Sequence, residues 1–268
     1  MSRVLIGAYV LAKDEASNIG RCLAALEQTG WRIHVLDSGS TDNTRAIVET
    51  FDGIRCESYG YVDHCTAYND VISCAGGQFD AVVVLDADMI VSPTLRDEVE
   101  GYVGSISMQW DVLCAPIEMW VDGHALKAGS LCPPKAFVFR PGRALFVGTG
   151  HAEAPVAGAR IVKLIHPLVH DDRKPYASFL ASQVRYAQKL VQRYQLGAVR
   201  PRDRLRVTTP LFVLLTPLFS LLLKLGFRSG RLGILYAMDR MIAEAVMYRT
   251  GLAARIDGVE KDGVDLHK

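Results

Sequence analysis

Residues 82–89 read Val-Val-Val-Leu-Asp-Ala-Asp-Met, and they indicate the fold class most clearly. Consecutive aliphatic residues are typical of a strand that is buried on both faces of a parallel sheet. Two carboxylates follow at its carboxyl end, where open α/β sheets bind their ligands. A bend there would let Asp86 take ribose hydroxyls while Asp88 holds a divalent cation on a diphosphate. The alternative is a surface pair of aspartates in a loop.

Polar residues follow two earlier apolar strands in the same way. Residues 4–11 form a predicted strand that ends in Ala-Lys-Asp-Glu before an amphipathic helix over 17–29. Residues 33–36 form the next strand and end in the polar segment 37–44, where Gly39 permits a tight turn and Thr41 or Asp42 can cap the next helix. Backbone amides and hydroxyls gathered there would suit a nucleotide.

The alternation of strands and helices continues up to residue 85. A third strand is predicted over 54–58, a helix over 63–75, and a fourth strand over 82–85. Strands that alternate with helices predict an α/β fold with a mostly parallel, Rossmann-like sheet and right-handed crossovers. No Gly-x-Gly-x-x-Gly follows the early strands and no Gly-Lys-Ser/Thr occurs, which argues against a dinucleotide-binding domain and a Walker-type phosphate loop. Phosphate binding would then depend on a cation and scattered donors.

Three segments together resemble the family 2 glycosyltransferases of the GT-A fold, which transfer sugars from nucleotide-diphosphate donors. They are residues 12–19, 36–44 and 85–88, in order and at the expected intervals. The resemblance covers about the first hundred residues. It implies that Asp86 lies on the nucleoside side and Asp88 on a bound Mg²⁺ or Mn²⁺, and that further residues bind the nucleotide sugar, namely Lys13, Glu15, Asp37, Ser38, Ser40 and Asn69. The sequence departs from the family before Asn69, where His64-Cys65-Thr66-Ala67-Tyr68 stands in place of a basic residue.

A second informative segment spans residues 148–174. Inverting sugar transfer needs a carboxylate that removes the proton of the acceptor hydroxyl, and Glu153 is the candidate base. The subgroup that builds bacterial lipopolysaccharide cores and surface polysaccharides has a similar His-plus-Glu segment, followed by a His-Asp segment. That resemblance implies that His170 is a second metal ligand beside Asp88. Arg173 and Lys174 could neutralise the leaving diphosphate.

Each of these assignments has a plainer alternative. Glu153 could be a salt-bridge partner on an exposed turn, in which case Asp171 or Asp172 is the next candidate base. His170 could be a hydrogen-bonded histidine near the surface. Arg173 and Lys174 could be a solvated charge pair, and His151 is expected to orient Glu153 or contact the acceptor.

The net charge of +1 conceals an asymmetry along the chain. Residues 185–255 contain thirteen Lys and Arg against three Asp and Glu. A basic surface of this kind needs an anionic partner, and aliphatic residues interleave it where a nucleic-acid-binding surface would carry aromatic ones. An anionic membrane surface is therefore the expected partner.

Residues 207–223 form an uncharged run that Pro210 and Pro217 interrupt. As one helix it would be about 25 Å long, shorter than a hydrocarbon core of roughly 30 Å. We expect a broken, interfacial or re-entrant pair of short helices; a core hairpin and a full transmembrane span are the alternatives. Two amphipathic helices are expected around this run, over 176–194 and 232–248, the second with a possible Arg240–Glu244 pair.

The expected organisation is one large domain with an appendage. A GT-A domain would cover 1–198, with a nucleotide-binding half over 1–100 and an acceptor half over 101–198, followed by a membrane-association region over 199–255 and a flexible tail over 256–268. The chain has six cysteines without Cys-x-x-Cys spacing, and only three residues precede the first strand, which favours a reduced setting. We therefore expect a peripheral or monotopic protein on the cytoplasmic face of a bacterial inner membrane.

Together with the resemblance, these observations predict a glycosyltransferase that moves a sugar from a nucleotide diphosphate to a lipid-linked or membrane-proximal saccharide. The resemblance implies inversion at the anomeric carbon and favours UDP over GDP as the carrier. One alternative is a nucleotidyltransferase, which would consume a nucleoside triphosphate and release pyrophosphate. Another is a non-catalytic nucleotide-binding scaffold of a polysaccharide assembly complex. The acceptor, the sugar and the oligomeric state are left open by the sequence.

Overall fold

The computed structural model describes residues 4–105, 109–143, 146–148, 153–155 and 158–264. The chain forms two compact units. Unit 1 comprises residues 1–123 and 132–173, and unit 2 comprises residues 124–131 and 174–268.

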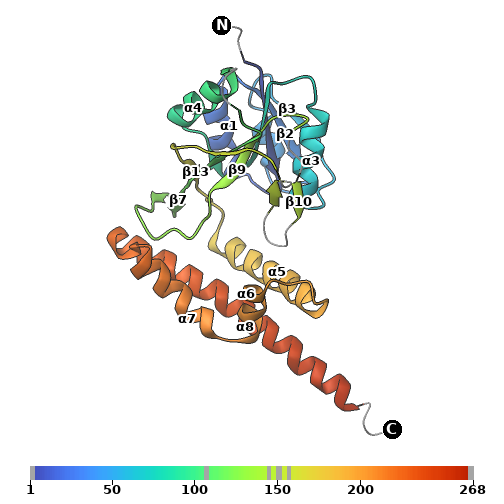
Figure 1. Cartoon of the computed structure of the whole chain (residues 1–268), viewed down its shortest axis with the longest axis vertical. Coiled ribbons are helices and arrows are strands. Elements are labelled where there is room, and N and C mark those ends of the chain that lie inside the picture. Colours follow the sequence, from blue (N-terminus) through green and yellow to red (C-terminus); the bar gives the residue numbers. More distant parts are fainter. Residues whose placement is uncertain (1–3, 106–108, 144–145, 149–152, 156–157, 265–268) are drawn as a thin grey trace. The chain divides into compact units, whose positions relative to one another are not determined.

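A seven-stranded mixed sheet forms the centre of unit 1, with the strand order β12-β6-β9-β4-β1-β2-β3. The four strands β1 to β4 are mutually parallel, as the alternating pattern predicts, whereas β9 runs antiparallel to both β4 and β6. The strands are β1 (Ile6–Ala12), β2 (Arg32–Asp37), β3 (Arg55–Ser58), β4 (Ala81–Asp86), β6 (Val112–Ala115), β9 (Lys135–Phe139) and β12 (Ile161–Lys163). The helices of this unit are α1 (Ile19–Glu27), α2 (Thr44–Val48), α3 (His64–Cys74) and α4 (Pro93–Gly104) (Figure 1).

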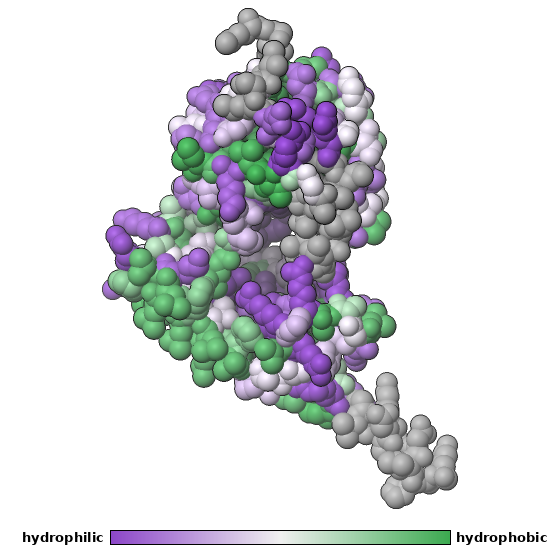
Figure 2. All heavy atoms as spheres, viewed as in Figure 1, coloured by the Kyte–Doolittle hydropathy of each residue, from purple (hydrophilic) through white to green (hydrophobic). Residues whose placement is uncertain are grey.

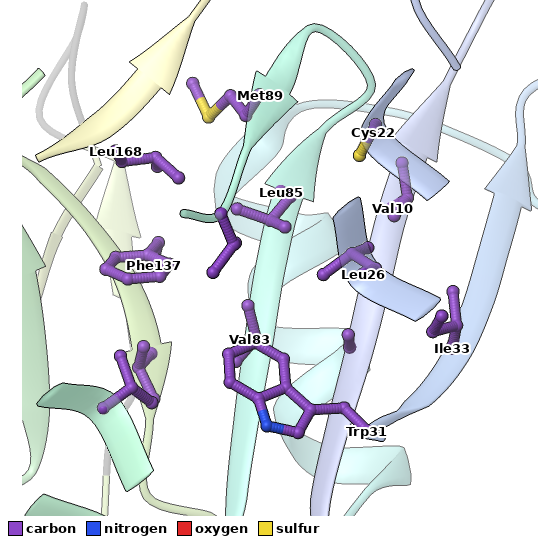
Figure 3. Packing of buried hydrophobic residues seen from close by; sticks show 14 of the residues in the cluster. Val10, Cys22, Leu26, Trp31, Ile33, Val83, Leu85, Met89, Phe137 and Leu168 are labelled. Atoms are coloured by element: carbon purple, nitrogen blue, oxygen red, sulfur yellow. The ribbon is translucent and has the colours of Figure 1, made fainter. Parts of the chain in front are cut away.

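Strand β4 is buried on both faces, as its sequence indicates. Val83 and Leu85 pack in the same cluster as Leu26 of α1 and Phe137 of β9 (Figure 3). Val82 and Val84 belong to a second cluster, which contains the buried residues of α3. Successive side chains of a strand point to opposite faces, so one apolar run builds two cores at once. This packing fixes the position at which the chain emerges from the sheet at Asp86.

A smaller group of strands begins just after the end of β4 in the chain. β5 (Met89–Ile90) pairs antiparallel with β13 (Leu168–His170), and β13 pairs parallel with β7 (Ile117–Val121). A separate antiparallel pair consists of β10 (Phe146–Gly148) and β11 (Glu153–Pro155). The β5–β13 pairing brings a segment from residue 170 next to the end of β4.

Unit 2 is mainly helical, and its helices contain the predicted amphipathic segments. It consists of β8 (His124–Ala125), α5 (Tyr176–Gln195), α6 (Pro201–Thr208), α7 (Leu211–Leu218), the π-helix η1 (Phe219–Leu223), the 3₁₀-helix η2 (Gly226–Ser229) and α8 (Arg231–Val264). Two features differ from the sequence analysis. α5 packs against α8 in unit 2, although we placed the domain boundary after residue 198. α8 continues to Val264, through most of the expected flexible tail.

The apolar run 207–223 is divided between helices. No single described helix is long and apolar enough to cross a membrane. α6 and residues 211–223 meet that test of length and composition only as a pair, bent by 113°.

Candidate active site

Two loops at the carboxyl ends of β1 and β2 are bound together by hydrogen bonds. The Asp14 amide donates to Ser40 Oγ at 2.9 Å, and the Thr41 amide donates to Asp14 Oδ1 at 2.7 Å. The Glu15 amide donates to Thr44 Oγ1 at 2.7 Å. Asp14 itself has a left-handed backbone with φ of +51°, a conformation that Asp tolerates better than most residues. The two polar segments that the sequence singles out therefore form one structured surface.

Asp37 lies fully buried at the base of this surface. Its carboxylate accepts hydrogen bonds from Ser40 Oγ at 2.5 Å, from the Gly39 amide at 3.2 Å and from Arg45 Nε at 2.6 Å. Burial would raise the pKa of Asp37, but the bonds from Ser40 and Arg45 outweigh it and lower that pKa. Gly39 turns the chain with φ of +78°. Arg45, which the sequence analysis did not consider, thus fixes Asp37 in its ionised form.

Asp86, at the end of β4, forms an ion pair with Lys135, the first residue of β9. Lys135 Nζ lies 2.5 Å from Asp86 Oδ2, and His64 Nδ1 lies 3.9 Å from Asp86 Oδ1. Burial would raise the pKa of Asp86, but the charges of Lys135 and His64 lower it to about 2. The cation beside Asp86 therefore comes from β9, a neighbouring strand that lies far away in the sequence. The family pattern would instead place a basic residue before Asn69. No sequence signal links Lys135 to Asp86.

Asp88 and His170 lie next to each other. His170 Nε2 is 3.0 Å from Asp88 Oδ2, and the Asp171 amide donates to the Asp88 carbonyl at 2.9 Å. Burial would lower the pKa of His170, but the hydrogen bond and charge of Asp88 outweigh it and raise that pKa. The β5–β13 pairing sets this proximity, because His170 stands opposite Met89 in the register.

A network of side chains holds the segment after His170 against α1. Asp171 is buried and forms ion pairs with Arg21 and with Arg173, whose Nε lies 2.6 Å away. The side-chain Nδ2 of Asn18 donates to both Asp172 Oδ1 at 2.8 Å and Glu15 Oε2 at 2.7 Å. Asn18 Oδ1 in turn accepts the backbone N–H of Arg173 at 2.8 Å. Asp171 therefore has a structural role, while Asp172 lies beside Glu15 at the site.

The Asp88–His170 pair fits a metal ion that a substrate helps to hold. Among the described residues, Asp88 Oδ1 is one of three buried side-chain atoms without a hydrogen-bond partner. No group of three or more His, Cys, Asp or Glu that could hold a metal occurs among those residues. Mg²⁺ and Mn²⁺ accept carboxylate ligands, and Mg²⁺ typically binds through one or two carboxylates together with substrate phosphates. Asp88 would supply the carboxylate of that mode and the diphosphate its oxygens, while His170 Nε2 would add a nitrogen ligand.

The remaining predicted residues are placed as follows. The Lys13 ammonium contacts the Gly39 carbonyl, and the Ser38 amide donates to the Ala12 carbonyl at 2.9 Å, so both belong to the joined loops. Asn69 lies on α3, the helix that begins at His64. Lys174 belongs to unit 2, whereas all the other predicted site residues belong to unit 1. The backbone of Glu153 pairs with Gly148 in the β10–β11 pair, but its side chain and the whole of His151 lie outside the described part of the chain.

Comparisons with known proteins agree with the sequence motifs. Residues 8–101, roughly a third of the chain, match the family model described as "Glycosyl transferase family 2". A crystal structure of S. aureus TarS 1-349 in complex with UDP-GlcNAc is 16% identical, with a TM-score of 0.49, over 95% of this chain and 92% of that chain. Glucosyl-3-phosphoglycerate synthase from Mycobacterium tuberculosis in complex with Mn²⁺ and UDP-glucose is 16% identical, with a TM-score of 0.43, over 71% of this chain and 79% of that chain. Both similarities are too weak to transfer residue roles to this chain.

Proposed function

We propose that this chain, whose residues 8–101 match glycosyl transferase family 2, is an inverting glycosyltransferase that uses a nucleotide-diphosphate sugar, with UDP as the expected carrier. The proposed acceptor is a lipid-linked or membrane-proximal saccharide at the cytoplasmic face of a bacterial inner membrane, in cell-surface polysaccharide synthesis. The observation that carries the proposal is the Asp88–His170 pair, which Asp172 and Asn18 connect to Glu15 of the joined loops.

Each part of the site has a proposed task in donor binding. Glu15, Ser38 and Ser40 belong to the joined loops at the ends of β1 and β2, where they would bind the base and ribose. Asp37 is buried beneath them and would hold Ser40 in place for that contact. Asp86 stays ionised because the positive charge of Lys135 stabilises its carboxylate. An ionised carboxylate accepts hydrogen bonds from ribose hydroxyls. Asp88 and His170 would hold Mg²⁺ or Mn²⁺, which supplies positive charge against the leaving diphosphate. Lys13, Asn69, Arg173 and Lys174 would add donors for the nucleotide sugar.

Transfer itself requires a base for the acceptor. In the proposed step the acceptor oxygen forms a bond to the anomeric carbon, the bond to the diphosphate oxygen breaks, and the nucleoside diphosphate leaves with the electron pair. Glu153 takes the proton of the acceptor hydroxyl, because the hydroxyl alone is a poor nucleophile. Asp172 is the second candidate for that task.

The metal ligands are tested with Asp88→Asn and His170→Ala. Both variants should lose at least about 100-fold in sugar transfer, since the charge on the departing diphosphate loses its cation. Metal-enhanced UDP binding, measured by calorimetry with and without Mn²⁺, should also disappear. Asp52→Asn removes an exposed carboxylate of unit 1 and should behave as wild type. Unchanged metal-enhanced binding in Asp88→Asn and His170→Ala would overturn the ligand assignment.

The products released during turnover separate the proposed function from its alternatives. A nucleotidyltransferase would consume a nucleoside triphosphate and release pyrophosphate, whereas the proposed enzyme releases a nucleoside diphosphate from a nucleotide sugar. A scaffold would bind the nucleotide with the metal but turn over none across a broad panel of acceptors. Release of UDP from a UDP-sugar with an acceptor present supports the proposal over both.

A further inference from the structure

The helical segment formed by α7 and η1 has its apolar side chains on the outside. Leu211, Leu214, Leu215, Leu218 and Leu222 recur at the three- and four-residue spacing of one helix face, and their exposed fractions lie between 47% and 65%. α7 contains no buried residue at all. A surface helix in water normally shows the opposite arrangement, with its apolar face buried and its polar face outside.

The polar residues of this segment point inward. Ser220 is fully buried, and its hydroxyl donates to the Gly129 carbonyl at 2.7 Å. Thr216 Oγ1 donates to Glu244 Oε1 of α8 at 3.4 Å. Glu244, which the sequence analysis paired with Arg240, instead accepts two hydrogen bonds from Arg206 of α6, at 2.8 and 2.9 Å. These polar contacts connect the segment to other parts of unit 2. The leucines on its opposite side remain exposed.

The apolar surface continues from the end of η1 into η2. Leu223, Leu225 and Phe227 follow directly in the chain and are exposed, Leu223 by 73%. Figure 2 shows hydrophobic residues gathered over the part of unit 2 where Figure 1 labels α7. We call this set the leucine face, defined as Leu211, Leu214, Leu215, Leu218, Phe219, Leu222, Leu223, Leu225 and Phe227.

The exposed charged residues that flank the leucine face in the chain are all cations. Residues 204–238 contain no Asp or Glu. Exposed cations precede the face on α6 and follow it along the chain, namely Arg202, Arg204, Lys224, Arg228 and Arg231. An apolar surface bordered by cations complements a bilayer with anionic headgroups, because the side chains enter the acyl boundary while the cations meet the phosphates. A second copy docked face to face would instead bring two sets of like charges together.

The geometry also favours lying in the interface over crossing the bilayer. Residues 211–223 would span about 20 Å as a helix, against roughly 30 Å of hydrocarbon. The 113° bend at residues 209 and 210 directs α6 away from that axis. The segment therefore has the length and shape of an element that lies in one leaflet.

We propose that the leucine face and its bordering cations bind the surface of an anionic phospholipid bilayer, with the leucines inserted at the headgroup boundary. This inference deepens the proposed function, since it rests on an acceptor that resides in a membrane, and it names the surface that meets that membrane. Binding to lipid requires neither donor nor metal.

Vesicle cosedimentation of the full chain tests the proposal. The wild-type chain should bind vesicles of phosphatidylcholine with phosphatidylglycerol, and bind pure phosphatidylcholine much more weakly. Leu222→Asp/Leu223→Asp should reduce binding at least tenfold while the thermal midpoint stays unchanged, because both side chains are already exposed. Leu196→Asp in unit 2 and Ile165→Asp in unit 1 change apolar residues outside the leucine face that are at least as exposed, and both should bind as wild type.

The contribution of charge is tested separately with Lys224→Gln and Arg228→Gln. Each should weaken binding to the phosphatidylglycerol vesicles about fivefold, and added salt should erase the difference. Failure of the wild-type chain to bind these vesicles would overturn the inference. So would a Leu222→Asp/Leu223→Asp variant that binds them normally but changes from dimer to monomer in sedimentation velocity, which would show a second copy as the occupant.

The two proposals fail in different assays. A chain that binds vesicles but releases no UDP from a UDP-sugar overturns the proposed function and supports this inference. A chain that transfers sugar but ignores anionic vesicles overturns this inference alone.

Discussion

Lys135 shows how a single side chain shapes the candidate site. It lies 2.5 Å from Asp86, and the pair stays largely buried, with exposed side-chain fractions of 18% and 29%. A carboxylate held by an ammonium stays ionised, as the pKa of Asp86 near 2 indicates. The structure thus places a fixed cation beside the first aspartate and a histidine beside the second.

The role of Lys135 is tested with Lys135→Met. Removing one partner of a buried ion pair leaves an uncompensated charge and costs about 3 kcal/mol of unfolding free energy. We expect the thermal midpoint to fall and UDP affinity, measured by calorimetry, to drop at least tenfold. Lys163→Met removes an exposed lysine of β12 and should change neither quantity.

A double variant separates binding from stability. Lys135→Met/Asp86→Leu removes both charges and should recover much of the lost stability, since a buried ion pair can often be replaced by apolar residues. It should not recover UDP affinity. If Lys135→Met binds UDP like wild type, Lys135 has no part in the donor site.

The elements of the first hundred residues followed from the sequence because their signals are local. The predicted strand 82–85 and helix 63–75 correspond to β4 and α3 within one residue at each end. The contacts of Lys135, Arg21 and Arg45 were not predictable in the same way. Lys135 reaches Asp86 because β9 inserts antiparallel beside β4, and that long-range pairing leaves no mark in either segment. The outward orientation of the leucines of α7 was likewise undetermined, since their spacing suits a buried face equally well.

One ion pair joins two strands of the sheet and gives a pH-dependent stability. Asp111 lies directly before β6, and Arg160 lies directly before β12. The Asp111 carboxylate accepts hydrogen bonds from the Arg160 backbone N–H at 2.9 Å and from Arg160 Nε at 3.0 Å. The hydrogen bonds of Arg160 outweigh burial and lower the pKa of Asp111 to about 2. Because the pKa of Asp111 is lower in the folded chain than its ordinary value near 4, the ionised group stabilises the fold at pH values above 4. That stabilisation is lost as the pH falls from 4 toward 2.

Asp111→Asn should therefore cost about 1–2 kcal/mol at neutral pH, a value reduced by the solvent exposure of Arg160. The difference from wild type should shrink between pH 4 and pH 2. Urea unfolding at several pH values measures it, with Asp97→Asn, an exposed carboxylate, as the control. A difference that is constant down to pH 2 would show that Asp111 acts through its shape and not its charge.

The whole molecule divides its proposed tasks between two units. Unit 1 contains the joined loops, the Asp86–Lys135 pair and the Asp88–His170 pair, while unit 2 contains the leucine face. The sequence analysis proposed both tasks from composition and motifs, and it grouped α5 with the residues of unit 1. Amphipathic spacing alone does not say which partner a helix packs against, and α5 packs against α8.

The central proposal is that Asp88 and His170 bind a cation that the diphosphate of the donor also binds. A crystal of the full chain grown with UDP and Mn²⁺ tests it most directly through the anomalous signal of manganese. We predict one manganese peak within bonding distance of an Asp88 carboxylate oxygen and of His170 Nε2, with both phosphate groups of the UDP diphosphate adjacent to it. Bound UDP whose manganese lies away from both side chains would contradict the account.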